Sequence, residues 1–335
     1  MNLKIPPETL PPLVREFTSY KSAIQNCSEK TVSEYTLDLR TFFRYLLARD
    51  KRISMDSEDF EKIDISVVDL DYIKNITTED IYEFIMYADN VRGNMAAAKS
   101  RKLSAIKGFF KYLTVKRFML EDNPAINIES PKKKQALPKY LSLEESLLLL
   151  DAIKNDKESK SRIRDYAIIT LFLNCGMRLS ELVGINLPDI DRELRSLTVT
   201  GKGNKQRIVY LNDACRDALG GYMEERLGEK YAKADTKALF LSSRSQRISV
   251  KTVQWMVYKY LDLAGLESKH YSVHKLRHTA ATLMYQSGNV DVRVLKDILG
   301  HEQLNTTQIY THVSNRSMEE AMAQNPLSSQ KKPKE

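Results

Sequence analysis

Apolar residues recur at helical spacing in the first third of the chain. Two runs, residues 31–47 and 99–113, place an apolar side chain at every third or fourth position. These positions are Tyr35, Leu39, Phe42, Phe43 and Leu46 in the first run, and Leu103, Ile106, Phe109, Phe110 and Leu113 in the second. Because this spacing collects the apolar side chains on one face, each run predicts an amphipathic helix.

The stretch between these helices, "SMDSEDFEKIDISVVDLDYIKN", is acidic and shows no sustained period. We predict an irregular excursion there, within residues 52–75, before a helix that begins in "TTEDIYEFIMYA". The second amphipathic run also carries basic residues away from its apolar stripe. They are Lys99, Arg101, Lys102, Lys107 and Lys111. A solvated face is the ordinary explanation of such a pattern.

A change of pattern marks a domain boundary. The stretch "NPAINIESPKKKQALPKY" contains three prolines and a lysine run, which favour an extended linker over residues 131–139. Helical periodicity resumes in "LSLEESLLLLDAI", where Ser142 is a candidate N-cap and Glu145 lies three residues later. We therefore predict a helical domain over residues 1–130 and a second domain over residues 140–335.

The second domain contains one antiparallel unit among its helices. Two β-rich runs flank the turn-like "GKGNK" in "RSLTVTGKGNKQRIVYL", which predicts a hairpin. No alternation of strands and helices follows, so a parallel sheet is excluded. The expected fold is mainly α with a small antiparallel β-sheet, the second domain being α+β.

Composition narrows the class of protein. The chain has 335 residues, a net charge of +8 and a pI near 9.1, which favours a polyanionic partner. Its three cysteines form no disulfide or zinc pattern. The first residues, "MNLKIPPETLPPL", have no apolar run behind their charge, so we expect no signal peptide. The longest apolar stretch, "YAIITLFLNCGM", is shorter than the roughly 20 residues of a membrane span. We expect a cytoplasmic protein without membrane contact.

The segment "SVHKLRHTAA" raises the first question of chemistry. His274 and His278 are four residues apart on a predicted helix, a spacing that zinc proteases use. Those enzymes need a glutamate after the first histidine, whereas this chain has Lys275, and Arg277 would repel a cation. We expect no metal here. An anion site and an ordinary polar helix end both remain open.

Other segments offer cations and one candidate nucleophile. In "LNCGMRLSELVGI" one helix is expected to end at Cys175–Gly176 and the next to begin near Arg178, a favourable place to bind an oxyanion. Glu181 is placed to hold a neighbouring cation. In "KDILGHEQLNTTQIYTHV" a helix is expected to end at Gly300, with a short helix bearing Tyr310 beginning near Thr306. Considered alone, each of these residues is most simply interpreted as an ordinary surface or core residue.

Taken together, six residues and their motifs resemble the tyrosine recombinases of the phage integrase family, most closely the Xer-type group. They are Arg178 in "GMRLSEL", Lys202 in "GKGNK", His274 and Arg277 in "HKLRHTAAT", His301 in "LGH" and Tyr310 in "IYTHV". The resemblance is strong over residues 140–315. It is fainter over the N-terminal helices, which look like the family's SAM-like core-binding domain.

The resemblance implies a mechanism. Tyr310 would attack a DNA phosphodiester and become linked to the 3′-phosphate. Arg178 and Arg277 would hold the non-bridging oxygens, where charge grows in the transition state, and His301 would donate a further hydrogen bond. The arginines take the place of a metal ion, so no cofactor is expected.

The remaining roles are also implied by the resemblance. His274 would be the base or hydrogen-bond partner near the tyrosine, and Lys202 would protonate the departing 5′-oxygen. His278 and His312 receive structural roles only. In the N-terminal domain, Lys99, Arg101 and Lys107 are the candidate DNA contacts.

The implied partner is double-stranded DNA with a specific inverted-repeat site. Two duplexes would be held by a tetramer, built from this chain alone or shared with a related recombinase. Chromosome dimer resolution is the favoured role. Integration or excision of a mobile element, a type IB-like topoisomerase, and a DNA-binding protein with a vestigial site are the alternatives.

Overall fold

The structure is a computed structural model that describes residues 5–131, 139–228, 237–288 and 290–300. The chain divides into two compact units, Met1–Gln135 and Ala136–Glu335. Within the described ranges, none of the helices is long and apolar enough to cross a membrane.

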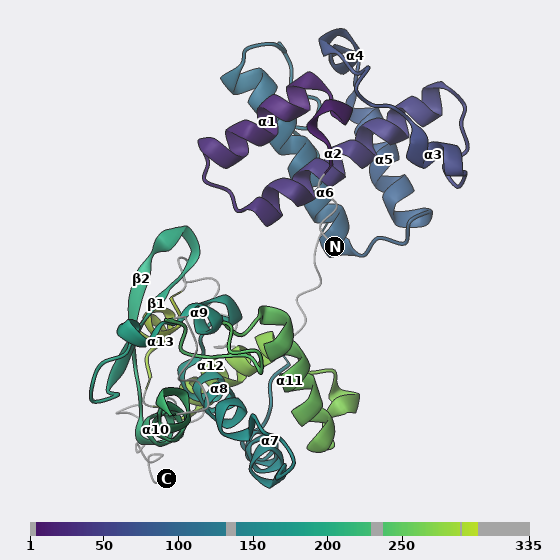
Figure 1. Cartoon of the computed structure of the whole chain (residues 1–335). Helices are drawn as coiled ribbons and strands as arrows, with labels where there is room; N and C mark the ends of the chain where they lie inside the picture. Colours follow the sequence, from purple (N-terminus) through teal and green to yellow (C-terminus); the bar gives the residue numbers. More distant parts are fainter. Residues whose placement is uncertain (1–4, 132–138, 229–236, 289, 301–335) are drawn as a thin grey trace, which may run out of the picture. The chain divides into compact units, whose positions relative to one another are not determined.

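The N-terminal unit is helical throughout. Its helices are α1 (Pro12–Ala23), α2 (Glu29–Asp50), α3 (Glu58–Lys62), α4 (Leu70–Lys74), α5 (Thr78–Asn90) and α6 (Ala96–Lys111), and α6 continues into a π-helical turn, Tyr112–Lys116. The two runs of periodic apolar residues lie in α2 and α6, as predicted. Helix α2 packs against α1, α5 and α6 (Figure 1). Aromatic side chains from these helices form much of the shared core.

The acidic stretch between α2 and α5 differs from the prediction. It is irregular outside two unpredicted five-residue helices, α3 and α4, and several of its apolar residues are buried in the core of the unit. The buried residues are Phe60, Ile63, Ile65, Val68 and Ile73. Their spacing follows no single period because the segment turns several times. A pattern search therefore misses a segment that packs through isolated side chains.

The C-terminal unit combines helices with one hairpin. Its helices are α7 (Leu143–Asn155), α8 (Arg162–Cys175), α9 (Leu179–Gly184), α10 (Asp213–Leu227), α11 (Val250–Leu263), α12 (Val273–Gln286) and α13 (Val292–Leu299). The strands are β1 (Ser196–Thr200) and β2 (Gln206–Tyr210), paired antiparallel with Val199 opposite Arg207. The predicted mainly-α fold with a small antiparallel sheet is confirmed. Helix α8 lies at the centre, in contact with α7, α10 and α12 (Figure 1).

Local signals in the sequence set two helix boundaries in this unit. Ser142 and Glu145 form a reciprocal capping box at the start of α7, as predicted. Helix α8 ends at Cys175, and Gly176 follows with φ +58°. A Cβ atom at Gly176 would lie 2.7 Å from Cδ2 of Leu299 at the end of α13. Glycine is therefore required both for the turn and for the close approach of α13.

Candidate active site

Arg178 occupies the N-cap position of α9, immediately after the Gly176 turn. Its guanidinium group donates from Nη1 to Oε1 of Glu181 over 2.7 Å and from Nη2 to the carbonyl oxygen of Gly300 over 2.8 Å. The side chain retains 36% exposure. Arg178 is thus oriented by two acceptors while part of its guanidinium group faces solvent.

Glu181 holds more than the one neighbouring cation expected of it. Its side chain is fully buried and accepts hydrogen bonds from both the backbone and the side chain of Arg178. It also accepts two from Arg207, over 2.8 and 2.9 Å. Burial pushes the pKa of Glu181 upward, but the hydrogen bonds and charges of the two arginines outweigh it and hold this pKa below its ordinary value.

Arg207 completes the cluster and was not among the residues predicted from the sequence. It lies on β2 on the same face as the buried Val209, and its side chain is only 16% exposed. The available signal was an arginine at an inward position of a predicted strand, because side chains alternate between the two faces. A charged residue at such a position needs a buried partner. Glu181 is that partner.

Arg277, on α12, is buried at 3% exposure. It donates from Nη1 to the carbonyl oxygen of Gly176 and from Nη2 to that of Leu299, both over 2.7 Å. Arg277 therefore joins the turn that precedes Arg178 to the end of α13.

The C-terminal end of α13 brings the three arginines together. Its last carbonyl oxygens have no partner within the helix and carry the negative end of the helix dipole. Ile298 accepts from Nε of Arg207 over 3.2 Å, and the next two carbonyls accept from Arg277 and Arg178. Figure 1 shows α13, α9 and the β1–β2 hairpin in one region of the C-terminal unit. Glu181 pairs with two of these guanidinium groups, those of Arg178 and Arg207, while Arg277 donates to backbone carbonyls, so one carboxylate faces three cations and the cluster keeps net positive charge.

His274 lies one turn before Arg277 on α12 and is exposed. Partial desolvation, followed by the charges of Arg277, Lys275 and Arg178, lowers the pKa of its imidazole below the ordinary 6.5. Its ring meets that of His278 edge-on, with centroids 4.7 Å apart. At neutral pH His274 is therefore uncharged and able to accept a proton.

Lys202 opens the short helical turn Lys202–Asn204 between the two strands, at the predicted hairpin tip. The preceding residue, Gly201, lies against the arginine cluster. A Cβ atom there would come within 3.3 Å of Oε1 of Glu181 and 3.8 Å of Nη1 of Arg178. The backbone that carries Lys202 is thus adjacent to Arg178. His301, Tyr310 and His312 lie outside the described residues.

The candidate DNA contacts on α6 differ in whether they form ion pairs within the protein. Lys99 pairs with Asp89 over 2.6 Å, and Arg101 pairs with Glu34 and Asp38. Lys102, grouped by sequence with the solvated face, is buried and bonded to Asp38 over 2.9 Å. The prediction of a solvated Lys102 was wrong because the helical period of α6 gives no information about α2, which supplies the carboxylate of Asp38. The other two basic residues, Lys107 and Lys111, make no ion pair within the described ranges.

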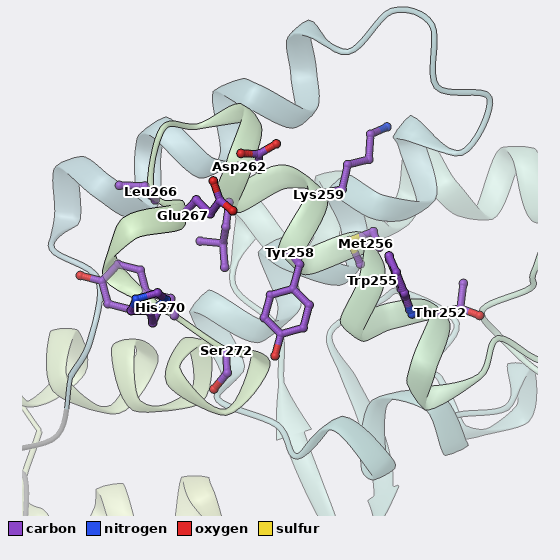
Figure 2. A pocket seen from close by; sticks show the side chains of 12 residues that line it. Thr252, Trp255, Met256, Tyr258, Lys259, Asp262, Leu266, Glu267, His270 and Ser272 are labelled. Atoms are coloured by element: carbon purple, nitrogen blue, oxygen red, sulfur yellow. The ribbon is translucent and has the colours of Figure 1, made fainter. Parts of the chain in front are cut away.

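A separate pocket of about 900 Å³ lies along α11 and the segment that leads into α12 (Figure 2). It is lined by Trp255, Tyr258 and His270, among others, and shares no lining residue with the arginine cluster. Among the described residues, no group of histidines, cysteines and carboxylates is arranged to hold a metal ion. The convergent cations of the C-terminal unit therefore identify the candidate active site, and the chemistry they suit is the binding of an oxyanion such as phosphate.

Comparison with known proteins identifies the family. The model of the phage integrase family matches residues 139–317. The chain belongs to this family. It is 49% identical over 318 residues to the tyrosine recombinase XerC of Caldanaerobacter subterraneus subsp. tengcongensis, covering 95% of this chain and 88% of the relative. It is 34% identical to XerC of Thermodesulfovibrio yellowstonii, covering 90% and 91%.

A solved structure agrees with this assignment. The crystal structure of the XerH site-specific recombinase bound to palindromic difH substrate, a post-cleavage complex, matches with a TM-score of 0.69 and 25% identity, covering 97% of this chain and 98% of that one. The chain is therefore a site-specific tyrosine recombinase of the Xer-like type, an enzyme that cuts and rejoins DNA. The resemblance read from the sequence is confirmed.

Proposed function

We propose that the arginine cluster of the C-terminal unit binds the scissile phosphate of DNA and that Tyr310 is the nucleophile. The observation that carries this proposal is the convergence of Arg178 and Arg277 on the carbonyl oxygens at the end of α13, with Glu181 bonded to Arg178. Backbone carbonyls orient a guanidinium group without cancelling its charge. The cluster can therefore stabilise the charge that grows on the non-bridging oxygens.

The other roles are those that the family resemblance implies, and the described position of His274 supports one of them. Neutral His274 accepts the proton of the tyrosine or a hydrogen bond from it, since its lowered pKa keeps it unprotonated at pH 7. Lys202, carried on the hairpin beside Gly201, protonates the departing 5′-oxygen. His301 donates to the same oxygens as the arginines. The phosphotyrosine bond retains the energy of the broken phosphodiester, so the strands rejoin without ATP.

Trapping of the covalent intermediate tests this proposal. A substrate nicked close to the cleavage site loses the short strand after attack, so the protein–DNA adduct accumulates and can be seen on a denaturing gel. Wild-type protein in buffer with EDTA is expected to form an adduct that maps to Tyr310. Tyr310→Phe should bind the same DNA and form none. An adduct that persists in this variant would assign the nucleophile elsewhere.

We propose that the enzyme resolves chromosome dimers in the cytoplasm as a tetramer on two duplexes that carry an inverted-repeat site. The relatives named XerC and the DNA-bound XerH complex support an Xer role. Removal of residues 317–335 should spare DNA binding and disturb pairing of the two duplexes, measured by gel-shift and recombination assays. Wild-type recombination by the shortened chain would count against coupling through the tail.

Two other outcomes would redirect the proposal. Relaxation of supercoiled DNA without a specific site would indicate a type IB-like topoisomerase. Insertion or release of a DNA segment between unlike sites would instead indicate the integrase of a mobile element.

A further inference from the structure

Arg207 contacts Glu181 in the manner of a fork. Its Nη1 and Nη2 atoms donate to Oε1 and Oε2 of the carboxylate over 2.8 and 2.9 Å. Two parallel hydrogen bonds of this kind fix the plane of the carboxylate as well as its position. The carboxylate of Glu181 is fully buried, so its orientation depends on these protein donors.

The same guanidinium group also reaches the end of α13. Its Nε donates to the carbonyl oxygen of Ile298, and a Cβ atom at Gly300 would lie only 3.0–3.1 Å from Arg207. Gly300 has φ +64°, and together these features require glycine there. Arg207 thus lies directly against the turn whose carbonyl oxygen accepts from Arg178.

Arg207 therefore bonds one acceptor of the Arg178 side chain directly and contacts the turn that carries the other. One is the carboxylate of Glu181, which Arg207 grips from the other side. The other is the carbonyl oxygen of Gly300, at the helix end to which Arg207 is bonded. If Arg207 is removed, Glu181 loses two hydrogen bonds and the end of α13 loses one, so the groups that orient Arg178 are less firmly held.

We propose that Arg207 is a positioning residue for DNA cleavage, acting through Glu181 and the end of α13 to aim Arg178 at the scissile phosphate. This inference rests on the proposed role of Arg178. A misplacement of about 1 Å at a reacting centre can cost roughly 10²-fold in rate. Lysine cannot replace Arg207, because one ammonium group does not reproduce the planar fork.

The first measurement is the single-turnover rate of adduct formation at saturating DNA. Arg207→Ala is expected to be slower by about 10–10²-fold, with a Kd for DNA within about twofold of wild type. Arg207→Met keeps most of the aliphatic volume and should show the same defect if the alanine variant unfolds. Arg216→Ala, an exposed arginine paired with Asp213 on α10, is the matched control and should cleave at the wild-type rate.

The second measurement separates aiming of Arg178 from a general loss of structure. A methylphosphonate at the scissile position carries no charge on its non-bridging atoms, so it no longer needs Arg178. The deficit of Arg207→Ala relative to wild type should shrink to a few-fold on this substrate. An equal deficit on both substrates would overturn the inference and leave Arg207 a purely structural residue. Restoration of the Arg207→Ala cleavage rate by a 5′-bridging sulfur would also overturn the inference, because it would show that the defect lies in leaving-group protonation by Lys202.

Failure of this inference is distinguishable from failure of the proposed function. If wild-type protein forms no adduct at Tyr310, the proposed function fails. If wild type forms the adduct and Arg207→Ala forms it at the same rate, only the inference about Arg207 fails.

Discussion

Basic residues are held in two different ways in the two units. On α6 of the N-terminal unit, Lys99, Arg101 and Lys102 are each paired with carboxylates. In the C-terminal unit, Arg178 and Arg207 pair with the one carboxylate of Glu181, and both of them and Arg277 also donate to backbone carbonyls.

This difference determines what charge is left for a ligand. A carboxylate both orients and neutralises its cation, whereas a carbonyl oxygen orients the cation and leaves its full charge. The basic count of a helix therefore says little about phosphate binding until the partners are known. This contrast between the two units can be tested by substitution and by pH.

The largest effect is expected at Lys202. Lys202→Ala should bind DNA normally and cleave about 10²–10⁴-fold more slowly, because the 5′-alkoxide leaves poorly without a proton donor. A 5′-bridging sulfur leaves without protonation and should largely restore the single-turnover rate. Tyr310→Phe is the control that sulfur cannot rescue. A lysine variant that stays slow with sulfur would show that Lys202 is not the general acid.

The next effect is on stability in the N-terminal unit. Lys102→Ala removes one donor from the buried carboxylate of Asp38 and should lower the free energy of unfolding by about 1–3 kcal/mol. Urea denaturation of the full chain measures this change. Lys111→Ala, on the exposed side of the same helix, is the control. Equal stability of the two variants would contradict the buried role of Lys102.

The cleavage rate should depend on the protonation of His274. Because the pKa of this imidazole is lowered, the neutral form prevails at and above pH 6.5. The rate is expected to stay level there and to fall as pH drops through the lowered pKa, about tenfold per pH unit at the limit. His274→Gln should lack this acid limb. A wild-type profile without it would remove His274 from the mechanism. Stability linked to His274 is lost over the same acid range.

The smallest effect concerns DNA affinity. Lys107 is unpaired within the described residues, so Lys107→Ala should reduce the slope of log Kd against log salt by about one. Lys99 is already engaged by Asp89, so Lys99→Ala should change the slope less. Fluorescence anisotropy at several salt concentrations measures both. A larger change for Lys99 would show that its ion pair gives way to phosphate.

Local signals in the sequence were sufficient to predict most of the helices and the hairpin. The period of α2 and α6, the capping box at Ser142, the hairpin around Lys202 and the helix end at Gly176 all depend on neighbours in the chain. The order of motifs around Arg178 and Arg277 was sufficient for the family. Each boundary, turn and motif is recognisable from a few consecutive residues.

Features that depend on distant partners were not predictable in the same way. Arg207 is 26 residues from Glu181 and 91 from Ile298, and no local period reports those contacts. Lys102 becomes a core residue only because Asp38 on another helix is buried beside it. The roles of His301 and Tyr310, outside the described residues, stay predictions. What the sequence lacked in each case was the identity of the partner.

We propose that Arg178 and Arg277, which both donate to backbone carbonyls, supply the charge for catalysis, and that the cations of α6, which are paired with carboxylates, do not. Single-turnover cleavage at saturating DNA tests it most directly, with Arg178→Ala and Arg277→Ala set against Lys99→Ala and Arg101→Ala. The account predicts losses of about 10²–10³-fold for the first pair and rates within about twofold of wild type for the second. Comparable losses in both pairs, or a wild-type rate for Arg178→Ala, would contradict it.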